Sequence, residues 1–141
     1  MFLSFSVASV IHSTSNSINE VDVRRFPQGY IVSHSQYGAE PYDDNIRPSL
    51  LLDGVQQRQI TLNFIEFELP EWCYDNLYIR HAGKTTGLCS KDKSDTVRIR
   101  PSDDDQIEFQ FRTIKDESYE KDETHGFLLF YRGKSTALLF C

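Results

Sequence analysis

Short runs in which hydrophobic and polar residues alternate dominate the centre of this chain, and this pattern is typical of β-strands. The clearest run is RQITLNFIEFEL, in which Ile60, Leu62, Phe64 and Phe67 lie mostly on one side. The alternation slips between Phe64 and Phe67, which predicts a β-bulge or an irregular strand end. No segment shows the i, i+3, i+4 apolar stripe of an amphipathic helix.

Further strand-like segments follow the same pattern. They are SLLLDG, DNLYIRHAG, TVRIRPSDDDQIEFQF and GFLLFYRG, and turn-forming residues separate them. In DNLYIRHAG, the alternation predicts that Leu77 and Ile79 point inward while Tyr78 and Arg80 point outward. Several short strands with regular turns predict an all-β fold, either an antiparallel β-sandwich or a jelly roll.

Length and charge limit the classes of protein that fit. A chain of 141 residues fits one domain. Its net charge of −6 argues against a nucleic-acid-binding protein, which would usually present a basic face. No run approaches the ~20 apolar residues that a membrane span needs. The acidic balance fits a soluble extracellular protein, a cation-binding protein or a partner for basic surfaces.

The ends of the chain differ in composition from its centre. Residues 1–25 are rich in Ser and Asn and read as a poorly ordered leader, with an apolar stretch from Phe2 to Ile11 that serines interrupt. This stretch lacks the basic residues of a good signal peptide, so it fits a weak or clipped signal or a wrongly assigned start. We assign residues 26–133 to the β-sandwich and 134–141 to a short tail that fits a truncated sequence.

Three cysteines occur, so they cannot all pair within one chain. Cys73 and Cys89 flank a hairpin-sized segment, and a local disulfide fits if the compartment is oxidising. Two free thiols in a cytosolic protein fit the spacing equally well. Cys141 marks a truncation, an intermolecular bridge or nothing.

No catalytic motif is present. The four histidines lack metal-ligand spacing, and neither a nucleophile elbow nor a P-loop occurs. We therefore predict a protein that is not an enzyme. A carbohydrate-binding β-sandwich is an alternative, in which Trp72 and Tyr78 would stack on a sugar.

The order of the motifs resembles the CUB domain, an extracellular β-sandwich module. The segments GYIVSHSQYGAEPY, ITLNFIEFEL, CYDNLYI, GLCS and GFLLFY follow one another as the corresponding motifs of that family do, over roughly Gly29 to Arg132. The resemblance implies a disulfide between Cys73 and Cys89. The first disulfide of most CUB domains is missing, because RPSLLL stands in that region, so the chain is similar to variants that keep only the second.

The resemblance also implies a calcium site. Many CUB domains bind one calcium ion through carboxylates from three loops, and Glu68 and Asp75 fall on two of the ligand positions. The third is Asp116, with Asp122 as a fallback, because FRTIKD replaces the family's F-x-S-D. Calcium is a hard cation that takes six to eight oxygen ligands at about 2.3–2.6 Å, so carboxylates suit it.

In the family, loops that calcium orders often bind a basic residue of a partner protein. The resemblance therefore implies a secreted, non-catalytic module that recognises an exposed Lys or Arg of an extracellular protein through Glu68 and Asp75. Tyr37 would brace an acid through its hydroxyl group, although a role in the core fits as well. The chain is equally compatible with an accessory domain of a larger secreted protease or receptor.

Overall fold

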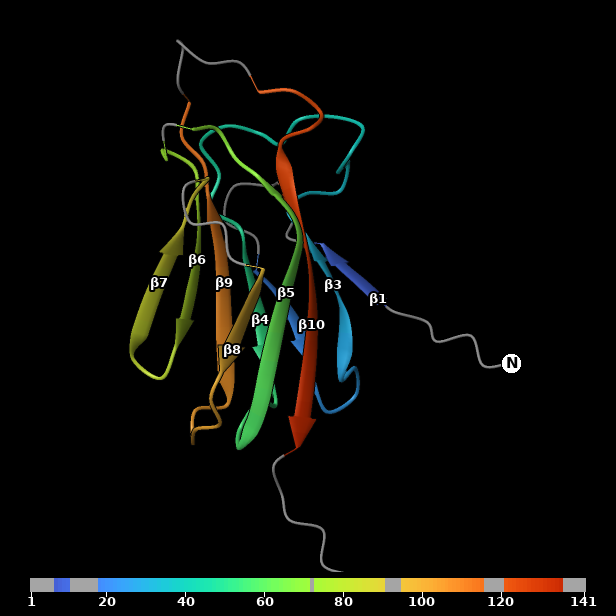
Figure 1. Cartoon of the computed structure of the whole chain (residues 1–141), viewed down its shortest axis with the longest axis vertical. Helices are drawn as coiled ribbons and strands as arrows, with labels where there is room; N and C mark the ends of the chain where they lie inside the picture. The colour runs from blue at the N-terminus through green and yellow to red at the C-terminus, as the bar shows by residue number, and fades with distance from the viewer. Residues whose placement is uncertain (1–6, 11–17, 72, 91–94, 116–120, 136–141) are drawn as a thin grey trace, which may run out of the picture.

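The computed structural model describes residues 7–10, 18–71, 73–90, 95–115 and 121–135. Within these residues, ten strands form two five-stranded sheets that pack face to face (Figure 1). The described residues include no helix, so the predicted all-β sandwich is confirmed. It follows that none of them belongs to a helix of the length and hydrophobicity that a membrane crossing needs.

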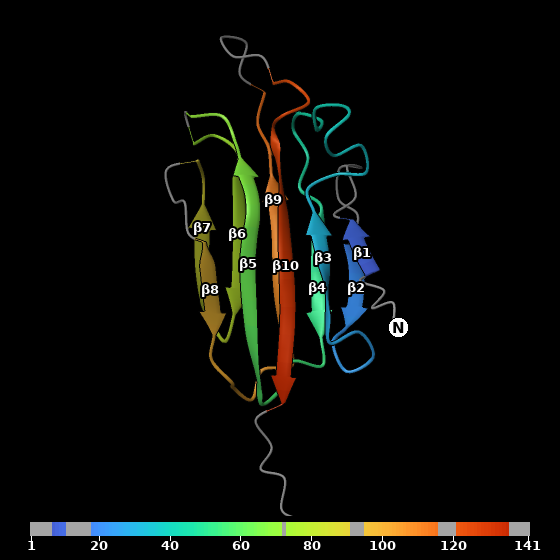
Figure 2. The same ribbon diagram turned by 45° about the vertical axis from the view of Figure 1, so that its right-hand side comes forward.

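The two sheets have matching strand orders. One contains, in order, β1 (Val7–Val10), β3 (Gln28–Val32), β10 (Gly126–Ser135), β5 (Arg58–Glu68) and β8 (Thr96–Ile99). The other contains β2 (Ile18–Asp22), β4 (Ser49–Asp53), β9 (Gln106–Arg112), β6 (Asn76–His81) and β7 (Lys84–Leu88). Neighbouring strands are antiparallel except for the parallel pairs β1–β3 and β2–β4. Each strand of one sheet lies opposite a strand of the other, with β8 facing β7 at one edge (Figure 2).

The sandwich extends beyond the predicted boundary at residue 26. Both β1 and β2 lie within the segment 1–25 that composition assigns to a leader, and Val23 is fully buried. Each of the two strands pairs in parallel with a strand further along the chain. Their Ser- and Asn-rich surroundings give little hydrophobic alternation, so the pattern of residues does not identify them as strands.

Alternating side chains of both sheets fill the space between them. Leu77 and Ile79 are buried while Tyr78 and Arg80 are half-buried, as the alternation predicts. Burying one such aliphatic or aromatic side chain stabilises the fold by about 1.5–3 kcal/mol. The side chains with no exposed surface include Ile31, Leu50, Leu52, Ile60, Leu62, Leu77, Ile107, Phe109, Phe111, Phe127 and Leu129.

The predicted irregularity in β5 is a β-bulge at Ile65. Leu129 of β10 pairs with Phe64 and Leu128 pairs with Glu66, so Ile65 is an extra residue, and its side chain is 52% exposed. An extra residue shifts the inward and outward alternation of the rest of the strand by one position. Phe67 therefore faces the core.

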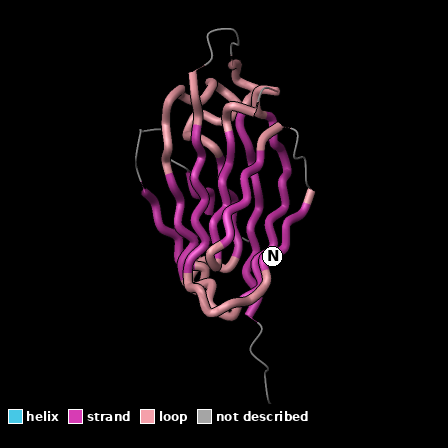
Figure 3. The backbone as a smooth tube through the Cα atoms, turned by 90° about the vertical axis from the view of Figure 1, so that its left-hand side faces the viewer, coloured by secondary structure: helices cyan, strands magenta, loops and turns pink. Residues whose placement is uncertain are grey.

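The loops gather at two opposite ends of the sandwich (Figure 3). We call the upper end the one at which β5 and β7 end and β6, β8 and β10 begin (Figure 2). Glu68 is the last residue of β5 and Asp75 immediately precedes β6, so both lie at the upper end. At the lower end, Ala82 and Gly83 connect β6 to β7 with φ angles of 51° and 74°, which suits a tight two-residue hairpin.

Candidate functional site

A hollow of about 520 Å³ lies beside the upper part of β5. It is lined by Tyr37, Gly38, Phe64, Ile65, Glu66, Phe67, Glu68, Asp95, Glu123 and Thr124. Four of these residues carry carboxylates, and none of the described lining residues is basic. We call this hollow, defined by Tyr37, Glu66, Glu68, Asp95 and Glu123, the acidic pocket.

The bulge in β5 brings two of the carboxylates into the pocket. If Ile65 were a regular strand residue and not part of a bulge, strict alternation from Phe64 would turn Glu66 toward the core and Phe67 outward. With it, Phe64 and Phe67 pack together, edge to face, with ring centroids 5.5 Å apart. Glu66 and Glu68 then flank Phe67 on the exposed side of the strand.

Tyr37 braces the pocket from the loop after β3. Its hydroxyl group donates a hydrogen bond to Glu66 Oε2, and its ring packs edge-on against His34 at 6.0 Å. Burial, the hydrogen bond to Glu66 and the negative charges of Glu66 and Glu68 together raise the pKa of Tyr37 well above its usual value. Tyr37 thus remains a neutral donor that holds one carboxylate in place.

A capped turn supplies the carboxylate of Glu123. Asp122 Oδ1 accepts hydrogen bonds from the Thr124 backbone N–H at 2.8 Å and from the Thr124 hydroxyl at 2.5 Å. These bonds from Thr124 hold the pKa of Asp122 below its usual range. Asp122, the fallback calcium ligand, is therefore engaged in shaping the turn.

Lys121 fastens this turn to the rest of the upper end. Its side chain is only 11% exposed, its Nζ pairs with Asp44, and it lies 4.1 Å from the centre of the Tyr42 ring. Cation–π contacts of this kind strengthen as they are desolvated. The turn that carries Glu123 is thereby held against the loop that follows β3.

Asp75 does not line the acidic pocket. Its side chain is 2% exposed, and its oxygens accept hydrogen bonds from the Tyr42 hydroxyl at 2.5 Å and from the Ile114 backbone N–H at 2.8 Å. A buried carboxylate needs such donors, because an unpaired buried charge is costly. Asp75 thus ties the start of β6 to two other loops of the upper end.

Two of the predicted calcium ligands, Glu68 and Asp75, lie at the same end of the sandwich but in different surroundings. Glu68 lines the acidic pocket, Asp75 is buried beside Tyr42, and Asp116 lies outside the described residues. Carboxylate oxygens suit calcium, and each oxygen of Asp75 keeps a lone pair beyond its hydrogen bond. Within the described part of the chain, no three His, Cys, Asp or Glu side chains lie close enough together to hold a metal ion. The calcium site stays a prediction.

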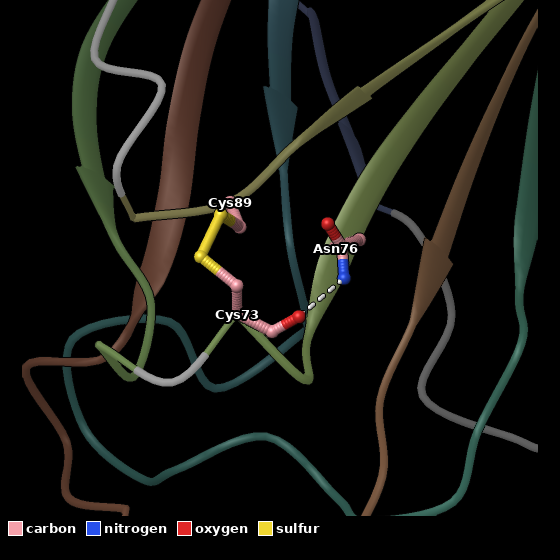
Figure 4. The surroundings of a disulfide bond; sticks show 3 residues. All are labelled: Cys73, Asn76 and Cys89. Carbon is pink, nitrogen blue, oxygen red and sulfur yellow. Dashed lines mark hydrogen bonds between the residues drawn. A yellow bond between two sulfur atoms is a disulfide. The ribbon is translucent and has the colours of Figure 1, made fainter.

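The disulfide between Cys73 and Cys89 is present (Figure 4). It joins the loop between β5 and β6 to the residue that follows β7 across a sequence separation of 16, with the Cα atoms 5.1 Å apart. Asn76 Nδ2 donates a 2.9 Å hydrogen bond to the Cys73 carbonyl, which fixes the turn that precedes β6. Cys141 lies outside the described residues.

The aromatic residues considered for sugar binding have different positions. Tyr78 is half-buried, with its ring against Gly87 and the Arg80 guanidinium group 5.6 Å from the ring centre. Trp72 lies outside the described residues. Tyr78 therefore presents less of its ring to solvent than a stacking platform would.

Three residues of the acidic pocket were not singled out from the sequence. Glu66 reads as one more outward polar position of β5, and only its pairing with Tyr37, 29 residues earlier, distinguishes it. Asp95 and Glu123 lie in loops whose positions depend on the register of β8 and β10. The slip in the alternation of β5 is the local signal that could have drawn attention to Glu66.

Comparison with known structures identifies the fold. No protein-family model matches the sequence, and a comparison with curated proteins gave no match. A structure titled as the MASP-1 CUB2 domain bound to Ca²⁺ superposes with a TM-score of 0.59 at 21% identity, covering 84% of this chain and 98% of that one. The CUB1-EGF-CUB2 domains of rat MASP-1 give 0.63 at 18% identity, covering 83% of this chain and 42% of that one.

A third similar structure is the full extracellular region of zebrafish Gpr126/Adgrg6. Its TM-score is 0.62 at 21% identity, and the match covers 87% of this chain but only 15% of that one. The chain therefore matches only a part of each of these two longer chains. Together with the sheet order and the disulfide, these likenesses show that the chain has a CUB-like fold.

Proposed function

We propose that this chain is a non-catalytic interaction module that binds a basic side chain of a partner protein in the acidic pocket. The observation that carries the proposal is the gathering of Glu66, Glu68, Asp95 and Glu123 around one hollow whose described lining includes no basic residue. Carboxylates that line one hollow repel one another, and an inserted ammonium or guanidinium group relieves that repulsion.

The pocket is suited in advance to such a ligand. Tyr37 holds Glu66 by a hydrogen bond, and the capped turn Asp122–His125 holds Glu123, so less conformational entropy is lost on binding. Charge-assisted hydrogen bonds to a carboxylate are stronger than neutral ones. Because the pocket is open to solvent, we expect binding to weaken as the salt concentration rises.

We place this module outside the cell. The disulfide supports an oxidising compartment, where such bonds persist. One similar structure contains CUB1, EGF and CUB2 domains, and another is a full extracellular region of which this chain matches 15%, which supports a role as an accessory domain of a larger secreted protease or receptor. The partner is then an extracellular protein with an exposed Lys or Arg.

We also propose that calcium strengthens this recognition. The support is the calcium ion named for the similar MASP-1 CUB2 structure and the placement of Glu68 and Asp75 at one end of this sandwich. Glu68, Asp75 and Asp116 are the residues that would hold the ion. A bound divalent cation would lower the cost of ordering the upper loops before a partner arrives.

A charge-matched substitution series tests the pocket. The probe is a fluorescent lysine-rich peptide, and the readout is its anisotropy on titration with the full chain at low and at physiological salt. The triple variant Glu66→Gln, Glu68→Gln, Glu123→Gln should weaken binding at least about tenfold, since each tenfold step is only about 1.4 kcal/mol. The control triple Glu20→Gln, Glu40→Gln, Glu71→Gln removes the same charge from exposed sites elsewhere. Equal losses in the two variants would show attraction by net charge alone and refute the pocket.

Calcium is tested separately by thermal unfolding. If calcium binds the native state, millimolar CaCl₂ should raise the midpoint relative to EDTA, while MgCl₂ should have little effect. An unchanged midpoint would remove calcium and leave the acidic pocket standing, provided that the peptide still binds.

A further inference from the structure

A second hollow, of about 550 Å³, lies at the opposite edge of the sandwich from β1 and β2. It runs between β7, the last strand of one sheet, and β8, the last strand of the other, which face each other at the left of Figure 2. Residues of both strands line it, together with the C-terminal end of β6 and the turn after β8. We call it the edge groove.

The groove exists because the inner face of β7 is not filled with apolar side chains. Lys84, Thr86 and Leu88 share one face of the strand, and Leu88 is buried while Thr86 pairs with the buried Ile79. Lys84 and Thr86 are nevertheless exposed, although they lie on the face that turns toward the other sheet. The space between the sheets is therefore open to solvent at this edge.

The wall of the groove that continues the core is apolar. Ile79 and Leu88 contribute from one sheet, and Val97 and Ile99 contribute from the other. Val97 and Ile99 are half-buried and pack against the hydrophobic core. Both belong to β8, which pairs with β5. Ile79 and Leu88 are 6% and 8% exposed. Because both walls of the groove are apolar, the groove favours an apolar ligand group.

The rim of the groove is basic in a chain that is acidic overall. Lys84, Arg98 and Arg100 line it and are exposed, and no described lining residue is acidic. None of the three forms an ion pair with a described carboxylate, in contrast to Arg80, which pairs with Glu108 at 2.9 Å. One acidic side chain lies beside the lower end of the groove, because Asp104 accepts a 2.9 Å hydrogen bond from the backbone N–H of the lining residue Ala82.

The charged and apolar parts lie at different ends of the groove. Lys84 begins β7 and Arg100 follows β8, so both lie toward the lower end (Figure 2). Leu88 ends β7 and Val97 is near the start of β8, so both lie toward the upper end. The groove therefore carries Lys84 and Arg100 toward its lower end and Leu88 and Val97 toward its upper end.

We propose that the edge groove binds a single-chain anionic amphiphile of fatty-acid size. Its carboxylate lies between Lys84 and Arg100, and its alkyl chain covers Ile79, Leu88 and Val97. The volume lies within the range of about 300–1,000 Å³ that small-molecule sites occupy. An added peptide strand is less favoured, since β7 and β8 are edges of only five and four residues.

Isothermal titration calorimetry of the full chain with laurate, below its micelle concentration, tests the proposal. Laurate should bind one site, and dodecyltrimethylammonium, which has the same tail and the opposite charge, should bind at least about tenfold more weakly. An acidic apolar peptide in a parallel titration should not bind. Equal binding of the two amphiphiles, or binding of the peptide but not of laurate, would overturn the proposal.

Two variants locate the site. Lys84→Gln with Arg100→Gln should weaken laurate binding about tenfold or more, and Thr86→Phe should abolish it by filling the groove. The control Arg132→Gln with Lys134→Gln removes two exposed cations of β10 that do not line the groove. Thermal unfolding of each variant verifies folding. Laurate affinity that survives both groove variants refutes the site, as does an equal loss in the folded control.

Discussion

The hydroxyl group of Tyr42 donates a 2.5 Å hydrogen bond to the carboxylate of Asp75, 33 residues later in the chain. Both side chains are buried, and the Ile114 backbone N–H donates to the other oxygen of Asp75. Lys121 lies over the Tyr42 ring. One carboxylate and one ring thus connect four segments of the upper end, which positions the loops around the acidic pocket.

Replacing Asp75 should therefore destabilise the whole domain. In Asp75→Ala, the Tyr42 hydroxyl and the Ile114 N–H both lose this acceptor, and the loss of these two bonds to a buried carboxylate costs about 1–3 kcal/mol. Urea unfolding followed by circular dichroism measures the change. Asp43→Ala, in which the lost carboxylate is exposed, is the matched control and should change the free energy of unfolding by less than about 0.5 kcal/mol. A similar small loss in both variants would contradict the role of the network.

A second prediction concerns Gly126, the first residue of β10. Its φ is 138°, and a Cβ atom there would lie 2.5 Å from Ser33 Oγ and 3.1 Å from a carbon of the Tyr37 ring. Gly126→Ala should cost about 2–4 kcal/mol, because backbone strain and overpacking add. Gly83→Ala is the control, since Gly83 also has a positive φ but a Cβ atom there would meet nothing within 4 Å. If both variants lose equal stability in chemical denaturation, contact with Ser33 is unimportant.

Much of the sandwich follows from residues that are neighbours in sequence. The alternation in β5, β6, β8 and β9 predicts strands and inward faces, and the slip after Phe64 predicts the bulge, because a period of two records directly which face is buried. The strands β1 and β2 were not predicted. Their parallel pairing with β3 and β4 depends on segments further along the chain, which local pattern does not report.

The residues of the candidate site likewise fall into those that the sequence identifies and those that only the folded structure brings together. Glu68, Tyr37 and the disulfide follow from motifs in order along the chain, and the disulfide is confirmed. The gathering of Asp95 and Glu123 with them depends on how three loops fold back over β5. The burial of Asp75 depends on Tyr42, which no spacing rule connects with it.

The disulfide should contribute measurably to stability. Joining Cys73 and Cys89 closes a loop with a sequence separation of 16, and in chain-entropy terms this stabilises the folded state by about 3 kcal/mol. Cys73→Ser with Cys89→Ser should lower the guanidinium midpoint accordingly. Dithiothreitol should lower the midpoint of the unmodified chain to a similar value and leave that of the double variant unchanged. If neither the double substitution nor dithiothreitol lowers the midpoint, the disulfide contributes little to stability.

The last prediction concerns acid, through a histidine beneath the acidic pocket. His34 is 2% exposed; its Nε2 lies 2.6 Å from the Glu40 carbonyl and its Nδ1 lies 2.7 Å from Ser33 Oγ. A carbonyl only accepts, so Nε2 carries the proton and Nδ1 accepts from the Ser33 hydroxyl. Burial lowers the pKa of His34, the hydrogen bond to Glu40 and the charge of Asp43 partly oppose this, and Lys121 adds to it.

Since the pKa of His34 is lower in the folded chain than the usual value of about 6.5, the unfolded chain binds more protons below that pH. The free energy of unfolding should therefore be fully maintained above about pH 6.5 and should fall as the pH decreases toward the folded pKa. Urea midpoints measured between pH 7.5 and pH 5 test this. His34→Gln removes the titrating group, so its midpoint should be lower at neutral pH but should change less over this range. If the variant keeps the full pH dependence of the unmodified chain, other groups cause the acid sensitivity and the assignment to His34 is wrong.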